Sequence, residues 1–265
     1  MSTRLTGKVA IVTGGGRGLG RAMAIALAQA GVHVAITAAR SKDELEAVAS
    51  AAGTGQILPL LADVLRDEDC ARVIEVVTAR FGPVDILVNN AGRGMRFVSE
   101  TFMSQPTRFW ETDPAIRRMV IDTNINGPFM MARAVVPGMI ARRWGRVINI
   151  SANYDTMRRR GFSPYGPSKA ALEAETVIWA QDLEGTGVTV NALLPGGPTR
   201  TGMVPDTVPE SIQRKLLDPE IMGAPLVWLV SDAAAGVTGK RINAASWDPA
   251  LPSATEEAAG WVVHK

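Results

Sequence analysis

The chain of 265 residues has little of what builds cross-links, metal sites and membrane spans. Its single cysteine, Cys70, excludes an internal disulfide and favours a reducing, cytoplasmic location. The two histidines, His33 and His264, lie far apart, so a histidine-based metal site has no support and we expect no metal. No apolar run approaches the roughly 18 residues of a membrane span.

Charge is also nearly balanced. The formal net charge is +2, which is too small to indicate nucleic acid or a membrane surface as a partner. Residues 1–6 lack the apolar centre of a signal peptide, so we expect the protein to stay where it is made. With 46% apolar and 20% charged residues, the composition is that of a soluble globular protein with a sizeable core.

A glycine-rich loop is the first motif. Residues 8–13 (KVAIVT) read as a buried strand, and an alanine-rich helix runs on to Gly31. Bare backbone at such a junction lets a pyrophosphate approach, and the helix N-terminus attracts its charge. The alternative is a plain tight turn, but the place between strand and helix favours a dinucleotide. The residues assigned to this contact are Gly14, Gly16, Arg17, Gly18, Leu19 and Gly20.

The second strand, residues 32–37, ends without the acid that would hold the ribose 2′-hydroxyl of NAD. The sequence there is Ala38-Ala39-Arg40. Arg40 and Arg17 could instead pair with the 2′-phosphate of NADP, although both could simply be solvated. We therefore favour NADP as cofactor over NAD.

Two further strands end in polar or small residues. Residues 56–61 lead to Asp63-Val64, where the carboxylate could accept from an adenine amino group or cap the next helix. Residues 84–88 lead to Asn90, Ala91 and Gly92, which suit the wall of a cofactor crevice.

Tyr165 and Lys169 form a Tyr-x-x-x-Lys pattern at the start of a helix over residues 165–183. Residues four apart share one helical face, so the phenol and the ammonium can reach the same space. A nearby cation should lower the tyrosine pKa from about 10 towards neutral pH, as acid–base catalysis requires.

Together these motifs resemble the short-chain dehydrogenase/reductase family. The matching segments are TGGGRGLG at 13–20, Asp63-Val64, NNAG at 89–92, Asn124 and YGPSK at 165–169. The resemblance covers nearly the whole chain. It implies an α/β fold in which residues 1–265 form a single doubly wound Rossmann domain, with a seven-stranded parallel sheet flanked by helices.

The resemblance also implies an NADP-dependent oxidoreductase that interconverts an alcohol and a carbonyl. Tyr165 is then the general acid or base, and Lys169 also bonds the nicotinamide ribose. Asn124 holds a water in a proton relay. Pro195, Gly196 and a threonine meet the nicotinamide carboxamide; Thr199 and Thr201 compete for that role, with Thr201 preferred.

The substrate-binding serine is the weakest match. The family places it thirteen residues before the tyrosine, and that position is Ala152. Ser151 lies one residue away and is the preferred candidate. Asn153 is the alternative donor.

Two loops are expected to shape the substrate site. Residues 93–113 carry aromatic residues and could line an apolar pocket or pack on another subunit, while residues 196–222 read as a mobile loop. The positive run at 157–160 is either solvated surface or an anchor for an anionic substrate. A long helix over 115–143 should kink at 124–128, where asparagine, glycine and proline occur together.

The expected partner is a small alcohol or carbonyl compound, and the resemblance suggests a homotetramer or homodimer packed through the helices at 115–143 and 165–183. Two other functions remain open. One is a non-catalytic protein that senses a dinucleotide or serves as a scaffold, because a fold does not fix a function. The other is a non-redox lyase on the same fold.

Overall fold

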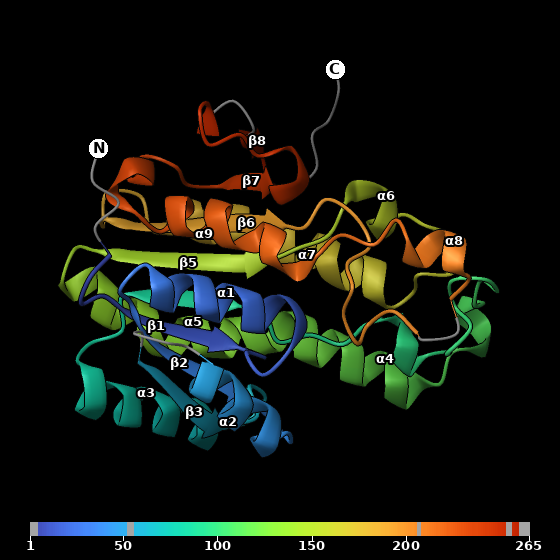
Figure 1. The fold of residues 1–265 in the computed structure, drawn as a ribbon, viewed down its shortest axis with the longest axis horizontal. Coiled ribbons are helices and arrows are strands. Elements are labelled where there is room, and N and C mark those ends of the chain that lie inside the picture. The colour runs from blue at the N-terminus through green and yellow to red at the C-terminus, as the bar shows by residue number, and fades with distance from the viewer. Residues whose placement is uncertain (1–4, 52–55, 206–207, 253–255, 260–265) are drawn as a thin grey trace.

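Short β-branched runs form the strands of one sheet, in the order β3-β2-β1-β4-β5-β6-β7-β8. The computed structural model describes residues 5–51, 56–205, 208–252 and 256–259 (Figure 1). The first seven strands pair in parallel. They are β1 (Val9–Thr13), β2 (His33–Ala38), β3 (Ile57–Leu61), β4 (Ile86–Asn89), β5 (Gly145–Ile150), β6 (Val188–Leu194) and β7 (Lys240–Asn243). The doubly wound parallel sheet expected from the sequence is confirmed.

An eighth strand was not expected. β8 (Glu256–Ala258) lies antiparallel to β7 and forms one edge of the sheet. Its three residues include two glutamates, so neither length nor apolar alternation marks them as a strand. The pairing with the open edge of β7, rather than local sequence, places this segment. Residues 1–4, on which the expectation about a signal peptide partly rests, lie outside the described part of the chain.

Helices cover both faces of the sheet (Figure 1). One core cluster packs α1 (Gly18–Gln29), α2 (Lys42–Ala51) and α9 (Gly223–Leu229) on the first face. A second cluster packs α3 (Asp67–Phe81), α5 (Gly127–Ala141) and α7 (Tyr165–Asp182) on the opposite face. Because both faces are buried, strands such as β1 are apolar throughout instead of alternating.

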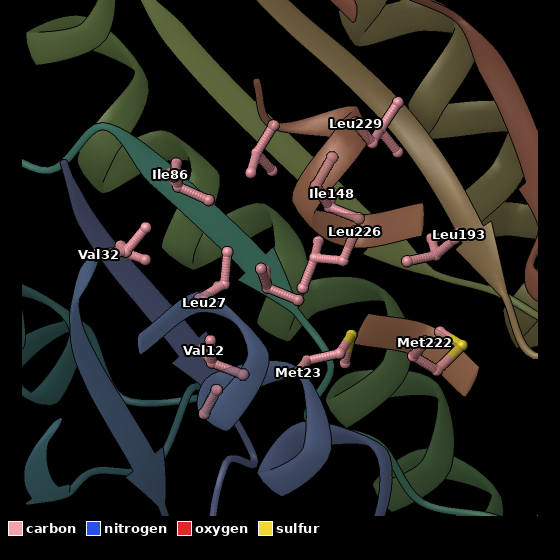
Figure 2. Close-up of a cluster of buried hydrophobic side chains, with 14 of the residues drawn as sticks. Val12, Met23, Leu27, Val32, Ile86, Ile148, Leu193, Met222, Leu226 and Leu229 are labelled. Carbon is pink, nitrogen blue, oxygen red and sulfur yellow. The ribbon is translucent and has the colours of Figure 1, made fainter. Parts of the chain in front are cut away.

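The core beneath α1 and α9 is built from long aliphatic side chains. Met23 and Leu27 of α1 meet Leu226 and Leu229 of α9 above the central strands, and all four are fully buried (Figure 2). Burial of each such side chain contributes roughly 1.5–3 kcal/mol from the apolar surface removed from water. This packing fixes α1, whose N-terminus carries the glycine loop.

The long helix expected over 115–143 is broken into two. α4 (Pro114–Ile121) leads through a π-helical turn (Asp122–Asn126) into α5. A Cβ atom at Gly127 would lie 2.7 Å from Val64 Cγ2, so only glycine allows this approach to the loop after β3. The expected interruption is therefore present, and it sets Asn124 at the break.

Small helical segments complete the described chain: α6 (Tyr154–Met157) and α8 (Glu210–Gln213), with short 3₁₀ turns. Within the described ranges, no helix is both long enough and apolar enough to cross a membrane. The same part of the chain contains no cluster of three or more histidine, cysteine, aspartate or glutamate residues suited to a metal ion.

Candidate active site

The predicted site residues gather at one edge of the sheet. In a parallel sheet the carboxyl ends of the strands lie together, and a ligand crevice forms where the strand order reverses. Here the reversal lies between β1 and β4. The glycine loop follows β1, residues 90–92 follow β4, residues 151–153 follow β5, and residues 195–201 follow β6. The fold thus brings these four segments to one edge, and it places the first two at the reversal itself.

Asn90 fastens the glycine loop to the end of β4. Its Nδ2 donates to Thr13 O at 2.8 Å and to Gly14 O at 3.0 Å. Thr13 Oγ1 in turn accepts from the backbone nitrogens of Asn90 and Ala91, both at 3.0 Å. Thr13 was missed from the sequence, although its hydroxyl at the end of a buried apolar strand was the available signal. Together these bonds fix the backbone that would face a pyrophosphate.

Close packing explains why glycine occupies several positions of the loop after β1. Gly14 has φ 65°, and a Cβ atom at Gly20 would lie within 2.5 Å or less of Gly14 O and Asn90 Nδ2. Gly18 also has positive φ, 53°, and faces Thr201. A Cβ atom at Gly16 would approach Glu44 to 3.3 Å. Leu19 packs onto the core beneath α1 and contributes backbone rather than side chain to this loop.

The N-terminus of α1 is suited to an anion. Arg17 occupies the N-cap without a side-chain cap bond, and the first turn contains no acid. The first N–H groups of a helix have no partner within it, so they and the helix dipole favour a phosphate. A cavity of about 410 Å³ lies here, lined by Gly18, Arg21 and Thr201 among others. These residues fit the phosphates of a dinucleotide.

The arginines expected at the ribose are differently placed. Arg40 is exposed at the end of β2, whereas Arg17 Nη1 lies 3.6 Å from Glu44 Oε1. Arg93 is a third guanidinium, and its charge and that of Arg40 act on one another. Its Nε is buried without a hydrogen-bond partner in the described structure, and it stacks over Phe97 at 4.7 Å. Sequence reasoning did not identify Glu44 or Arg93, because neither lies in a recognisable motif.

The segment after β3 is a tight turn. Asp63 Oδ1 accepts from Leu65 N at 3.1 Å, while Asp63 N donates to Asp69 Oδ2 at 3.0 Å. Asp69, rather than Asp63, therefore makes the bond that links α3 to this turn. Val64 is buried against Gly127. This leaves Asp63 Oδ2 as the atom for the predicted adenine contact.

Tyr165 and Lys169 lie on one face of the first turns of α7. Lys169 Nζ is 5.9 Å from the Tyr165 ring centroid and donates to Ile150 O at 2.7 Å. Burial raises the pKa of Tyr165 to about 12. This increase in pKa is opposite to the predicted decrease. Removing a phenolate from water costs more free energy than its attraction to the nearby ammonium contributes. The phenol is therefore protonated at neutral pH, as a general acid must be.

Burial also lowers the pKa of Lys169 to about 8, and the negative charge of Glu173 opposes that change. An ammonium with such a pKa exchanges its proton close to neutral pH. Lys169 is therefore suited to return a proton to Tyr165 near neutral pH.

Asn124 is fully buried within the π-helical turn and joins three segments. Its Oδ1 accepts from Arg93 N at 2.7 Å, and its Nδ2 donates to Arg93 O at 3.0 Å and to Ser168 Oγ at 2.9 Å. Ser168 Oγ also donates to Tyr165 O at 2.7 Å. The side chain thus positions the loop after β4 and the turn that carries Tyr165. Gly92 lies beside it, since a Cβ there would be 3.2 Å from Asn124 Oδ1.

The prediction that Ser151 binds the substrate requires a correction. Ser151 is buried and its hydroxyl donates to Glu173 Oε1 at 2.6 Å. A hydroxyl has one hydrogen to donate, so Ser151 has none left for a substrate carbonyl. The geometry does not support Ser151 as the substrate donor. Asn153 Nδ2 donates to Gly196 O at 2.8 Å and retains a second N–H.

We therefore expect Ser151→Ala to reduce turnover by less than about tenfold, the loss of one ordinary internal hydrogen bond. Asn153→Ala should reduce it about 100-fold, the usual cost of losing a donor to a developing oxyanion. Steady-state kcat of both variants with one carbonyl substrate checks this pair. A 100-fold loss in Ser151→Ala would restore the serine hypothesis, and full rates in both would leave Tyr165 as the only donor.

The segment after β6 turns sharply at Gly196, which has φ 93°, and Pro195 before it is partly exposed. Thr199 is 6% exposed and its Oγ1 donates to Gly197 O at 3.1 Å. Thr201 lies against Gly18 of the glycine loop. This arrangement favours Thr201 over Thr199 as the residue facing a cofactor.

The loop over 93–113 divides into two parts. Met95 and Phe102 pack with Phe162, and Tyr165 lies against this small cluster. Farther along, Phe109 and Trp110 are 72% and 66% exposed. The first part therefore borders Tyr165, whereas the second presents an aromatic pair on the surface.

The loop over 93–113 also touches the loop over 196–222. Arg96 Nη1 donates to Gly202 O at 3.2 Å, and a Cβ atom on Gly94 would lie 3.4 Å from Met203 Sδ. Residues 158–160 of the positive run are exposed, and Arg159 stacks on Phe162 at 4.9 Å. The site is thus bordered by apolar side chains with arginines at its rim.

Comparisons with known proteins agree with this geometry. The pattern of the short chain dehydrogenases matches residues 8–211. An acetoacetyl-CoA reductase from Shinella zoogloeoides is 34% identical over 245 residues, covering 89% of this chain and 96% of the relative. A 3-oxoacyl-acyl-carrier-protein reductase from Thermotoga maritima is 30% identical over 251 residues, covering 91% and 97%. The solved structure of a protein from Sinorhizobium meliloti 1021, assigned to the short-chain alcohol dehydrogenases, superposes with a TM-score of 0.80 at 30% identity, covering 91% and 96% of the two chains.

Proposed function

Because the chain belongs to the short-chain dehydrogenase family of oxidoreductases, we propose that it interconverts an alcohol and a carbonyl with NADP as cofactor. The observation that carries this proposal is the Tyr165–Lys169 pair on α7, which follows the end of β5 at the same edge as the glycine loop. The relatives named as 3-oxoacyl and acetoacetyl-CoA reductases support a ketone as the first substrate to test.

Each protein group has a defined task in this reaction. A bound nicotinamide supplies or accepts the hydride. In reduction Tyr165 gives its phenolic proton to the developing alkoxide, and its raised pKa keeps that proton in place beforehand. Lys169 returns a proton towards the phenol and would bond the nicotinamide ribose. Asn153 would donate to the substrate oxygen with its second N–H.

Asn124 is also proposed to position two segments. Its side chain bonds Arg93 and Ser168. In this proposal it orients the loop after β4 and the start of α7, and any water of a relay would be held by the backbone of the same π-helical turn, where carbonyl bonding is irregular.

The direct test is oxidation of NADPH with a panel of carbonyl compounds that includes 3-oxoacyl thioesters and simple ketones. Loss of absorbance at saturating ketone, with the matching alcohol as product, is the expected result. Product formation with unchanged absorbance would instead indicate a non-redox lyase. Tight cofactor binding without turnover of any compound would indicate a sensor or scaffold.

The preference for NADP can be measured directly. NADP(H) should bind at least about tenfold more tightly than NAD(H), which is about 1.4 kcal/mol and within reach of one arginine–phosphate pair. Arg40→Ala should remove this preference, because Arg40 is the exposed cation at the end of β2. Glu44→Gln should strengthen NADP binding, since it releases Arg17 from its ion pair.

Calorimetric titration of both cofactors measures these changes, with Arg80→Ala as the control because Arg80 lies at the distant end of α3. Equal affinities for the two cofactors in the unaltered chain, or a preserved preference in Arg40→Ala, would contradict the assignment.

A homo-oligomer is also proposed, either a dimer or a dimer of dimers. Phe129 and Ile140 on α5 and Ile178 on α7 are 45%, 39% and 53% exposed. Large apolar side chains on the outer faces of two neighbouring helices are suited to a two-fold interface. Light scattering should give at least twice the monomer mass at micromolar concentration, whereas a monomer mass would refute this proposal.

A further inference from the structure

Three consecutive residues at the end of β5 are each tied to a different charged side chain. Ile150 O accepts from Lys169 Nζ at 2.7 Å, Ser151 Oγ donates to Glu173 Oε1 at 2.6 Å, and Ala152 O accepts from Arg241 Nη2 at 3.0 Å. The segment that leads to Asn153 is therefore held by three bonds in a row.

Glu173 and Arg241 also pair with each other behind this segment. Arg241 Nε lies 3.2 Å from Glu173 Oε1, and the two side chains are only 6% and 1% exposed. Moving a carboxylate out of water costs several kcal/mol unless a cation and hydrogen bonds replace the lost solvation. Here Arg241 and Ser151 supply that replacement for the carboxylate of Glu173, which lies four residues beyond Lys169 on the same helix.

We propose that Glu173 is a positioning residue for the oxidoreductase: its carboxylate acts on Lys169 from four residues along the same helix, and its bond to Ser151 fixes the strand end that Lys169 contacts. The proposal rests on the function proposed above. It also explains why Ser151 points away from the substrate, because its hydroxyl serves the carboxylate that acts on Lys169.

The charged and titratable groups around this site come from α6, α7, β7 and β8. Lys169 shares α7 with Tyr165, Glu173, Glu175 and Asp182, and burial raises the pKa of Glu175 to about 7. Glu173 faces Arg241 of β7, whose other side meets Glu257 of β8 at 3.1 Å and the ring of Tyr154 of α6 at 3.9 Å. Arg158, at the end of α6, also acts on Tyr154.

The sign of the effect follows from the charge. Burial lowers the pKa of Lys169 to about 8, and Glu173 works against that decrease. If the carboxylate is neutralised, the pKa of Lys169 falls further, so the ammonium is lost at lower pH. Activity that needs the charged lysine should then decline at lower pH as well.

Glu173→Gln tests this, because glutamine keeps the shape and an acceptor for Ser151 but removes the charge. Two measurements are made: the pH profile of kcat/KM for NADPH, and the titration of Lys169 followed by NMR of ¹⁵N-labelled lysine, assigned with a Lys169→Met sample. Both midpoints should move about one pH unit lower.

A second variant separates positioning from simple stability. Glu173→Gln leaves Arg241 buried beside a neutral group, which alone could loosen the fold. The double variant Glu173→Gln/Arg241→Met removes that unpaired charge, so its melting temperature should recover. The midpoint of Lys169 should nevertheless stay low. Ser151→Ala, which keeps both charges, should leave the midpoint within about a third of a unit of the original.

The outcomes decide the proposal. If the double variant regains the original Lys169 midpoint and pH profile, Glu173 serves only to pair with Arg241 and the proposal is overturned. A shift as large in Ser151→Ala would attribute the effect to the hydrogen bond and overturn the part played by charge. Should the unaltered chain turn over no carbonyl compound, the proposed function fails, while the NMR titration still tests the action of Glu173 on Lys169.

Discussion

Replacement of Tyr165 with phenylalanine is expected to lower turnover about 1,000-fold while folding and cofactor binding persist. A positioned general acid contributes roughly 100- to 10,000-fold to a proton-transfer reaction, and the substitution removes only the hydroxyl. The ring keeps its packing against the cluster of Met95, Phe102 and Phe162, so the melting temperature should change little.

Single-turnover oxidation of NADPH at saturating carbonyl compound measures this effect. Tyr154→Phe is the matched control: it removes the other tyrosine hydroxyl of the chain, which donates to Ala258 O of β8 at 3.4 Å. Tyr154→Phe should keep most of the rate. Turnover of Tyr165→Phe within about tenfold of the unaltered chain would show that another group delivers the proton.

Lys169→Met should also lower kcat by about 100-fold or more, because the proton relay loses its cation. Unlike the tyrosine variant, it should weaken cofactor binding about tenfold, since a charged hydrogen bond to the ribose contributes roughly 1.5–3 kcal/mol. Methionine fills much of the buried space, although Ile150 O loses its 2.7 Å donor.

The two variants therefore differ in their binding signature. Calorimetric affinity for NADPH should be near normal in Tyr165→Phe and reduced in Lys169→Met. An unchanged affinity in Lys169→Met would remove the ribose contact from the mechanism while leaving its role in proton transfer open to the kinetic measurement.

Much of the fold could be predicted from the sequence because local patterns agreed with the final packing. Buried parallel strands appear as continuous β-branched runs, as in β1 and β6, and the glycine loop lies where a strand meets a helix. β8 could not be predicted, since its three residues form a strand by pairing with the open edge of β7 rather than by their own sequence pattern.

The orientation of Ser151 was within reach of the sequence. Side chains two apart on a strand share a face, so Ser151 continues the face of Asn149. Asn149 Nδ2 donates to Thr176 Oγ1 on α7 at 3.0 Å, and Ser151 meets Glu173 on the same helix. Counting positions from the tyrosine leads to Ala152, whereas alternation along β5 is the better guide to where Ser151 points.

Glu173 could have been found in the same way, because it continues the four-residue spacing of Tyr165 and Lys169 along one helical face. Arg241 could not, since its approach from β7 depends on sheet order. The pKa of Tyr165 was misjudged for a related reason: a motif shows which charges are near, whereas burial depends on side chains from distant segments.

The two outer strands of the sheet bear on how copies of this chain can meet. An exposed strand edge offers unpaired N–H and C=O groups to a neighbouring chain and can start aggregation. β3, at one edge, carries Pro59, which has no N–H to donate, and β8, at the other, is three residues long with two glutamates. Extension of the sheet from one molecule to the next is thereby opposed at both ends. Pro59→Val would restore an N–H group on this edge and is expected to favour edge-to-edge association between copies of the chain.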